Sequence, residues 1–156
     1  MIDPKRKLMT LCIPHHGRRV LLGMKKRGFG AGRFNGFGGK LKVGETVEVA
    51  ARREVFEEAG INVKSMSKVA VIEFEFQGNP ELLEVHLFKI HEFSGEPQEG
   101  EEMRPQWFFV DEIPFRQMWS DDPYWFPYFL TDRQFSARFL FDKEEKVLDY
   151  HITEKK

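Results

Sequence analysis

The sequence predicts an α+β domain in which a mixed β-sheet lies between helices. Short segments of alternating apolar and polar residues recur along the chain and mark several strands. One segment near the middle, residues 46–59, has the periodicity of an amphipathic helix, and a second helical region lies late in the chain. Many strands with one central and one late helix are typical of a sheet that helices cover on both faces.

The individual elements follow from residue pattern and from the turns between them. Pro-His-His-Gly at 14–17 and Gly-Asn-Pro at 78–80 are typical of turns that join two strands. Pro114, Pro123 and Pro127 break the late aromatic region into short helices. In chain order we expect strands over 7–13, 19–25, 68–76, 83–90, 105–110, 137–141 and 146–152, and helices over 46–59, 111–119 and 123–130.

Length and charge restrict the class of protein. The 156 residues suffice for a core of their own, and we expect one domain over 1–156 with a flexible tail at 1–6. A net charge of −1 gives no general attraction to DNA or RNA, so the expected partner is a small molecule and no polymeric nucleic acid. No membrane-spanning run and no signal peptide is recognisable. The single cysteine, Cys12, fits a reducing compartment. We expect a monomer in the cytoplasm, with the nucleus and mitochondrion open as further locations.

Three carboxylates lie close together near the C-terminal end of the expected central helix. Glu54, Glu57 and Glu58 face the negative end of the helix dipole, at a cost of about 0.3–1 kcal/mol each. A solvated acidic face is the ordinary explanation of such a run. At about 100° per residue, however, the three acids continue the apolar stripe of the helix instead of opposing it. Inward-facing carboxylates favour a hard cation, Mg²⁺ or Mn²⁺.

A glycine-rich, basic loop precedes this helix. Residues 24–40 contain six glycines, five basic residues and no acid. Glycines let backbone N–H groups turn toward an anion, and Lys and Arg add positive charge, so the loop suits a polyphosphate. It matches neither a Walker A loop nor the G-x-G-x-x-G fingerprint, and alone it could be a mobile hinge. Followed directly by an acidic helix, it indicates a nucleoside triphosphate bound with a divalent cation.

The loop and the helix together resemble the Nudix box, the motif of the Nudix hydrolase family. The pattern of the box is G-x5-E-x7-R-E-U-x-E-E-x-G-U, in which U is aliphatic. The matching residues are Gly39, Glu45, Arg53, Glu54, Val55, Glu57, Glu58, Gly60 and Ile61. The resemblance implies a Nudix α/β/α sandwich and hydrolysis of a nucleoside diphosphate that is linked to another group.

Residues beyond the box resemble the MutT-type branch that hydrolyses oxidised purine nucleoside triphosphates. The similarity extends over roughly residues 8–130. It implies catalysis by Glu54, Glu57 and Glu58, with Arg53 orienting a carboxylate. The implied metal ligands are Gly38, Glu54, Glu57, Glu58 and Glu102. The implied substrate contacts are Thr10, Lys25, Phe29, Asn35, Phe37, Gly38, Gly39, Lys40, Phe74, Met103, Trp119, Ser120, Asp121, Asp122 and Trp125.

Asp121 and Asp122 are the expected readers of the base, together with Asn35. Two aspartates before a proline are most simply a turn or a helix cap. Beside Trp119 and Trp125, the two carboxyls could instead share a proton in a dry pocket, and so donate to one base edge or accept from another. Such a site would suit both 8-oxoguanine and 2-hydroxyadenine.

Three residues depart from the pattern of this branch. Phe34 stands where tryptophan is expected, Leu83 where methionine is expected and Ser120 where proline is expected. The last two adjoin the expected pocket, so they bear on base preference and not on the reaction. Phe76 shares a strand face with Phe74, and for Phe76 core packing is an equal alternative to lining the pocket.

The sequence therefore predicts a Mg²⁺-dependent pyrophosphohydrolase, with Mn²⁺ as an alternative ion. It would convert oxidised purine nucleoside triphosphates, such as 8-oxo-dGTP and 2-hydroxy-dATP, to monophosphate and pyrophosphate. One glutamate of the cluster would act as general base, and the sequence favours none of them. Two rival functions stay open: Nudix hydrolysis of ADP-ribose or dinucleoside polyphosphates, and a non-catalytic nucleotide-binding module. The intact Glu54, Glu57 and Glu58 argue against the second.

Overall fold

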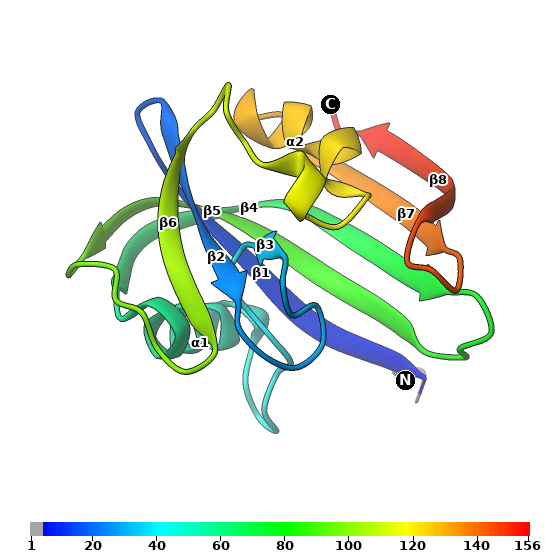
Figure 1. The fold of residues 1–156 in the computed structure, drawn as a ribbon, viewed down its shortest axis with the longest axis horizontal. Coiled ribbons are helices and arrows are strands. Elements are labelled where there is room, and N and C mark those ends of the chain that lie inside the picture. Colours follow the sequence, from blue (N-terminus) through cyan, green and yellow to red (C-terminus); the bar gives the residue numbers. More distant parts are fainter. Residues whose placement is uncertain (1–4) are drawn as a thin grey trace.

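The computed structural model describes residues 5–156, which form a mixed β-sheet with a helix on each face (Figure 1). Its strands are β1 (Arg6–His16), β2 (Arg19–Lys25), β3 (Phe34–Asn35), β4 (Asn62–Phe76), β5 (Leu82–Ser94), β6 (Met103–Phe109), β7 (Phe135–Phe141) and β8 (Val147–Glu154). The helices are α1 (Val47–Ala59), α2 (Asp122–Leu130) and the short 3-10 helix η1 (Phe115–Gln117). The predicted α/β/α sandwich is confirmed.

The order of the strands is β3-β2-β1-β5-β4-β7-β8, and β6 pairs with β2. β1 runs parallel to β5 and β4 runs parallel to β7, whereas the other pairs are antiparallel. In this register Met9 lies opposite Val85, and Leu83 lies opposite Phe74. Three neighbouring central strands therefore place these four side chains beside one another, where they line the cavity described below.

α1 has the ends that the sequence predicts. The hydroxyl of Thr46 accepts a hydrogen bond from the N–H of Val49 over 3.2 Å, which satisfies one of the free donors at the helix start. Gly60 ends the helix in the left-handed region, at φ 73°, and its N–H donates to the carbonyl of Phe56. Because four small or branched apolar residues of α1 are buried, the predicted acids lie between a packed face and solvent.

α2 runs through Pro127 without a break, so the prediction that this proline interrupts the late helical region is wrong. Of the helix expected at 111–119, only η1 forms. Pro127 lacks an N–H and so removes one helical hydrogen bond from α2. The same helix places Trp125, Phe126 and Phe129 in the core, and burial of each large apolar side chain stabilises the fold by about 1.5–3 kcal/mol. Packing therefore outweighs the lost bond.

The two faces of the sheet carry separate cores, and α1 and α2 lie on opposite sides in Figure 1. On one face α2 packs through Trp125 and Phe129 against strand residues such as Phe139. On the other face α1 packs through Val55 against Cys12, among others. The glycine-rich loop connects the two regions, so it can contact the acids of α1 at one end and the aromatic residues near α2 at the other.

Two details near the N-terminus and in the loop differ from expectation. Arg6 begins β1 and forms ion pairs with Glu73 and Glu84, both at 2.7 Å, so the tail predicted at 1–6 does not include it. Residues 1–4 of that predicted tail lie outside the described residues. The loop also contains β3, which pairs with β2 and was not expected. Neither helix within residues 5–156 has the length and hydropathy needed to cross a membrane.

Candidate active site

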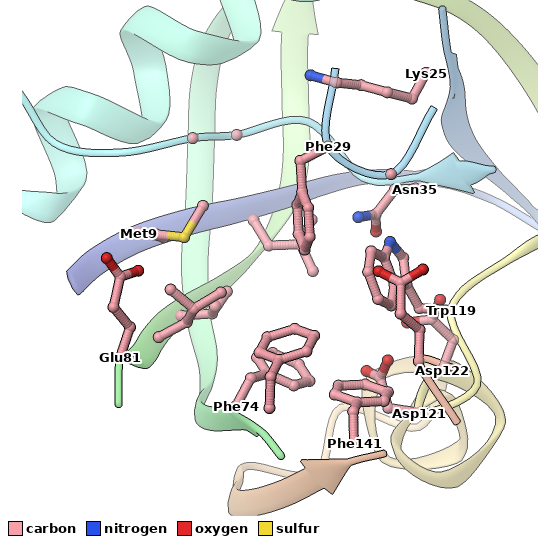
Figure 2. A pocket seen from close by; sticks show the side chains of 18 of the residues that line it. Met9, Lys25, Phe29, Asn35, Phe74, Glu81, Trp119, Asp121, Asp122 and Phe141 are labelled. Atoms are coloured by element: carbon pink, nitrogen blue, oxygen red, sulfur yellow. The ribbon is translucent and has the colours of Figure 1, made fainter. Parts of the chain in front are cut away.

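A cavity of about 970 Å³ opens on the α2 side of the central strands. Its floor is the row of apolar strand residues around Phe74 and Leu83, and Phe29 stands over it in Figure 2. Asp121, Asp122 and Trp119 lie at one end, whereas Met9 and Glu81 lie at the other. Gly38, Gly39 and Glu58 also line it. The cavity thus connects an aspartate-rich, aromatic end with the glycine-rich loop and α1.

Arg53 organises the acids of the box. Its guanidinium donates to both oxygens of Glu45, at 2.6 and 2.9 Å, and to Glu54 at 2.7 Å. It also donates to Glu57 at 3.2 Å and to the carbonyl of Lys40. The Arg53 guanidinium lowers the pKa of Glu45 to about 2. One arginine therefore offsets the repulsion between carboxylates at this end of α1 and orients Glu54, as the sequence predicts for it.

Glu58 is the most buried of the three helix acids. It accepts a hydrogen bond from the N–H of Gly38 over 2.8 Å. Burial, together with the negative charges of Glu54 and Glu102, raises the pKa of Glu58 to about 7. The Gly38 N–H and the charge of Lys25 oppose this rise and do not cancel it.

Glu57 and Glu102 are more exposed and are held by basic residues. The side chain of Glu57 is about half exposed and pairs with Arg53 over 3.2 Å. Glu102 accepts from Arg27 at 2.8 Å and lies 3.7 Å from the ammonium of Lys25, and the Arg27 hydrogen bond lowers its pKa. Within residues 5–156, no three His, Cys, Asp or Glu side chains are arranged so as to hold a metal ion. The structure brings Glu54 and Glu58 to the glycine loop but does not gather Glu57 and Glu102 with them.

The donors around Glu58 nevertheless suit a hard cation. All of the predicted ligands offer oxygen, which Mg²⁺ prefers. A Cβ on Gly39 would lie about 3.0 Å from the carboxylate of Glu54, so the loop approaches this acid as only glycine permits. A positive charge between the loop and α1 would stabilise the ionised carboxylates of Glu54 and Glu58, of which Glu58 has a raised pKa. The residues present therefore fit a divalent metal.

The aspartate-rich end of the cavity contains two buried carboxyls. Asp121 is 3% exposed and Asp122 is 2% exposed. The indole N–H of Trp125 donates to Asp121 Oδ2 over 2.7 Å, whereas Asp122 Oδ2 has no hydrogen-bond partner among the described residues. Burial raises the pKa of both carboxyls, and the charge of Asp121 raises that of Asp122 further. Asp121 occupies the N-cap position of α2, but its side chain makes no capping bond. Asp121 therefore does not cap α2 through its side chain.

Aromatic rings enclose the space next to these carboxyls. The ring centroid of Phe29 lies 5.1 Å from that of Trp119 and 6.0 Å from that of Phe76. Phe141 stacks on Phe76 at 5.1 Å and on Phe74 at 5.8 Å. Phe29 is 64% exposed, so it has little core to stabilise and is free to contact a planar ligand. Phe76 lines the cavity and packs on the core at once, so both of its expected roles apply.

Three further predicted residues surround the entrance. Thr10 is buried, and its hydroxyl lies 3.4 Å from the N–H of Gly39. Asn35 accepts from the N–H of Gly36, and its side chain is directed toward Trp119 in Figure 2. Lys25 lies near the top of that view. Together they supply polar groups between the aspartate pair and the acids of α1.

Most of the predicted substrate contacts line the cavity, and three do not. The lining members are Thr10, Lys25, Phe29, Asn35, Gly38, Gly39, Lys40, Phe74, Met103, Trp119, Asp121 and Asp122. Phe37 is fully buried in the α1-side core, and Trp125 is fully buried beneath Asp121. Ser120 does not line the cavity, and its hydroxyl donates to the carbonyl of Glu145 and accepts from the N–H of Val147.

Several lining residues were not expected from the sequence. Met9, Glu81 and Phe141 reach the cavity from β1, the start of β5 and the end of β7. Asp142, Lys143 and Glu145 come from the turn between β7 and β8. Alternation on β7 marks Phe141 as inward-facing, but only the parallel pairing of β4 with β7 shows that it reaches Phe74. The turn residues carry no comparable signal in the sequence.

The fold is similar to solved structures of known type. A mutator MutT protein from Bacillus halodurans superposes with a TM-score of 0.84 at 27% identity, covering 94% of this chain and 97% of that chain. A MutT Nudix hydrolase from Burkholderia pseudomallei superposes with a TM-score of 0.65 at 30% identity, covering 70% of this chain and 87% of that chain.

The sequence is also similar to curated proteins and to a family model. It is 52% identical to the oxidized purine nucleoside triphosphate hydrolase of Mus musculus and 51% identical to that of Danio rerio. Each alignment covers 95% of this chain and 95% of the relative. The model of the NUDIX domain matches residues 5–129, which include the box, α1 and the aspartate pair. The chain therefore belongs to the Nudix family.

Proposed function

We propose that the protein is a pyrophosphohydrolase that cleaves oxidised purine nucleoside triphosphates, among them 8-oxo-dGTP and 2-hydroxy-dATP, to monophosphate and pyrophosphate. The observation that carries the proposal is the buried Asp121–Asp122 pair in the same cavity as Gly38, Gly39 and Glu58. The names of the mouse and zebrafish relatives support the substrate class. ADP-ribose and dinucleoside polyphosphates also carry a base that carboxyls could bind, so the substrate panel below includes both.

The proposed metal is Mg²⁺, with Mn²⁺ as an alternative. Glu54, Glu57, Glu58, Glu102 and the carbonyl of Gly38 would hold it, and Glu57 and Glu102 would exchange their bonds to Arg53 and Arg27 for it. When bound, the ion neutralises phosphate charge and lowers the pKa of a water molecule. One glutamate of this group would accept the proton of the attacking water. Arg53 keeps Glu54 oriented throughout, because it retains two bonds to Glu45.

The chain itself would place the polyphosphate. Lys25 contributes a positive charge on the rim of the cavity. Gly38 and Gly39 bring backbone close to where the phosphates would pass, since any larger residue at Gly38 would overlap the carbonyl of Thr10. Close approach of backbone and a lysine charge are what a polyphosphate needs for binding and orientation.

The base would be read by the carboxyl pair. An 8-oxo group adds a hydrogen on N7, so an acceptor edge of guanine becomes a donor edge. An ionised aspartate accepts from that N–H, and a neutral one donates to a ring or carbonyl acceptor. The opposed environments of the pair, with Trp125 bonded to Asp121 and nothing bonded to Asp122 Oδ2 among residues 5–156, support one charged and one neutral carboxyl. Trp119 and Phe29 would stack on the ring.

A substrate panel tests the proposal. Purified protein with Mg²⁺ or Mn²⁺ is given dGTP, dATP, 8-oxo-dGTP, 2-hydroxy-dATP, ADP-ribose and a dinucleoside polyphosphate, and released pyrophosphate and monophosphate are quantified. We expect kcat/KM to be at least about tenfold higher for the oxidised triphosphates than for dGTP. The normal base would leave a buried carboxyl without a hydrogen-bond partner, and such a loss discriminates strongly between substrates. Preference for ADP-ribose, or equal rates with dGTP and 8-oxo-dGTP, would refute the proposal.

A further inference from the structure

Beside the aspartate pair, residues from three separate segments contact one another, and two of them, Trp119 and Glu145, line the cavity. Arg33 lies within the glycine-rich loop just before β3, Trp119 and Ser120 precede α2, and Glu145 lies in the β7–β8 turn. We call Arg33, Trp119, Ser120 and Glu145 the wall clamp. Its members are far apart in sequence, so the contacts among them are a property of the fold.

Arg33 makes two contacts that fix its guanidinium. Its Cζ atom lies 4.2 Å from the centre of the Trp119 ring, which is a cation–π distance. Its Nη2 atom donates to Glu145 Oε1 over 2.9 Å. The two side chains are only 29% and 35% exposed, so solvent screens this pair incompletely. Arg33 therefore ties the indole to the β7–β8 turn.

Ser120 attaches the same turn a second time. Its hydroxyl donates to the carbonyl of Glu145 over 3.3 Å and accepts from the N–H of Val147 over 3.1 Å. The turn is itself ordered by Asp142, whose carboxylate accepts from the N–H groups of Glu144 and Lys146. A proline at position 120 would have no hydroxyl to make either bond. The attachment of the β7–β8 turn therefore depends on the serine that this chain has at position 120.

The clamp acts on the residues that face the base. Trp119 accepts a hydrogen bond at its carbonyl from the N–H of Asp122, so the backbone that carries the indole is bonded to the backbone that carries this carboxyl. On the loop side, Gly28, Gly30 and Gly32 all have positive φ, and Phe29 is exposed between them. Without Arg33, this loop and Trp119 would be joined only by neutral contacts such as the one between Phe29 and Trp119.

We propose that Arg33 and Glu145 are specificity-determining positioning residues. They hold Trp119, and through it Asp122, at the spacing that an oxidised purine requires, and they do not touch the reacting phosphates. The inference rests on the proposed function, because selectivity for an oxidised base is the property that the clamp sets. Binding and orientation of the polyphosphate stay with Lys25, Gly38 and the acids of α1.

The chain offers a matched control for the central variant. Arg133 combines the same two contacts, since its Cζ atom lies 4.4 Å over the ring of Tyr128 and its Nη1 atom donates to Glu154 over 3.0 Å. Arg133 and its partners do not line the cavity. Arg33→Met and Arg133→Met therefore remove equivalent interactions, and only the first is in the wall clamp.

The kinetic test compares base selectivity in these variants. We expect Arg33→Met to raise KM for 8-oxo-dGTP by about fivefold, with kcat within about twofold of wild type, as loss of a partly desolvated cation–π contact predicts. The ratio of kcat/KM for 8-oxo-dGTP over dGTP should fall. Glu145→Gln should have a smaller effect in the same direction, and the double variant should not exceed Arg33→Met, since both act through one pair. Arg133→Met should leave the ratio unchanged.

Fluorescence of the nucleotide-free protein provides a readout that does not depend on activity. Acrylamide should quench tryptophan emission more strongly in Arg33→Met than in wild type, because Trp119 loses its covering guanidinium. It should leave Arg133→Met at the wild-type value. Greater quenching with a lower selectivity ratio supports the proposal. An unchanged ratio, whether quenching rises or not, overturns it, and so does an equal loss of kcat/KM for all substrates.

The two proposals fail in different ways. Wild-type protein that prefers no oxidised base refutes the proposed function, and the selectivity role of the clamp with it. Wild-type protein that does prefer oxidised bases, with an Arg33→Met variant of the same preference, refutes the clamp alone.

Discussion

Trp125 donates its indole N–H to Asp121 Oδ2 over 2.7 Å, from one helical turn along α2. Both residues are buried, so this bond is the polar contact that favours the charged form of Asp121 against the effect of burial. Asp122 Oδ2 has no such partner within residues 5–156. Neighbouring carboxyls in one cavity thus differ by a single donor.

Trp125→Phe should therefore shift the titration of the pair upward. The ring is retained and the donor is lost, so the charged form of Asp121 loses its stabilisation and the pKa of the pair rises. Leaving a buried carboxyl unpaired should also cost about 1–3 kcal/mol of unfolding free energy. The pH dependence of kcat/KM for 8-oxo-dGTP and urea unfolding at pH 7.5 measure the two effects. Trp107→Phe, which alters a ring outside the cavity, is the control, and an unmoved pH profile in Trp125→Phe would contradict the assignment.

Asp122→Asn should stabilise the protein at neutral and alkaline pH. Burial and the charge of Asp121 raise the pKa of Asp122 in the folded state, so the folded state binds a proton that the unfolded state has released. Wild-type stability should therefore fall as pH rises above about 4, the ordinary aspartate pKa, until the folded pKa is passed. The variant lacks this loss. Melting temperatures from pH 4 to pH 8 should diverge with rising pH, and parallel curves would show that the carboxyl is solvated.

Asp121→Asn and Asp122→Asn should change 8-oxo-dGTP and 2-hydroxy-dATP hydrolysis unequally. An amide cannot switch between donating and accepting at one atom, whereas a carboxyl can by taking or losing a proton. A site with a buried polar group rejects, by large factors in kcat/KM, a substrate that leaves this group without its hydrogen-bond partner. The measurement is kcat/KM for both substrates and dGTP between pH 6 and pH 9. Equal losses for all three in both variants would mean that the pair only builds the start of α2.

Glu58→Gln and Glu57→Gln should each lose most turnover, by about 100-fold or more, while the fold remains intact. For Glu58 the folded pKa is raised to about 7, so ionisation of the buried carboxylate lowers stability as pH rises through that value. Glu58→Gln should therefore melt at or above the wild-type temperature at pH 8 without metal. Glu48→Gln, an exposed acid in the first turn of α1, is the control for helix charge. Near-normal turnover in both active-site variants would remove the metal assignment.

Gly38→Ala should destabilise the protein far more than an ordinary glycine substitution. A Cβ at this position would overlap the carbonyl oxygen of Thr10, which is backbone and cannot move away without breaking the contact between the loop and β1. We expect a loss of about 2 kcal/mol or more and weaker binding of triphosphate. Gly100→Ala is the matched control, because nothing lies within 4 Å of its Cβ. Equal melting temperatures for the two variants would show that the loop adapts freely.

The acids and their helix could be predicted because their chemistry is local. Thr46 and Gly60 mark the ends of α1 in the sequence itself, and the fixed spacing from Gly39 to Ile61 identifies the box. The direction of each acid was less predictable. Glu58 is largely buried as expected, whereas Glu57 is about half exposed and pairs with Arg53.

The far wall of the cavity could not be predicted, because it depends on contacts between distant segments. Phe141 reaches Phe74 only through the parallel pairing of β4 with β7. Glu145 enters the cavity wall through bonds to Ser120 and Arg33, and nothing near Glu145 in the sequence indicates this. For Trp125 the family resemblance implied a substrate contact, whereas the structure buries its ring and bonds its indole N–H to Asp121.

The parallel pairing of β1 with β5 also has a consequence for folding. Arg6 lies opposite Leu82, so the first strand must wait for a partner that follows α1 and β4 in the chain. Contacts between residues so far apart in the sequence slow folding, because the intervening chain loses conformational entropy before the contact contributes any stabilisation. The cavity draws on β1, β5 and β7 together, so it is complete only when these distant strands have paired. A bound nucleotide would then stabilise only molecules in which that pairing is in place.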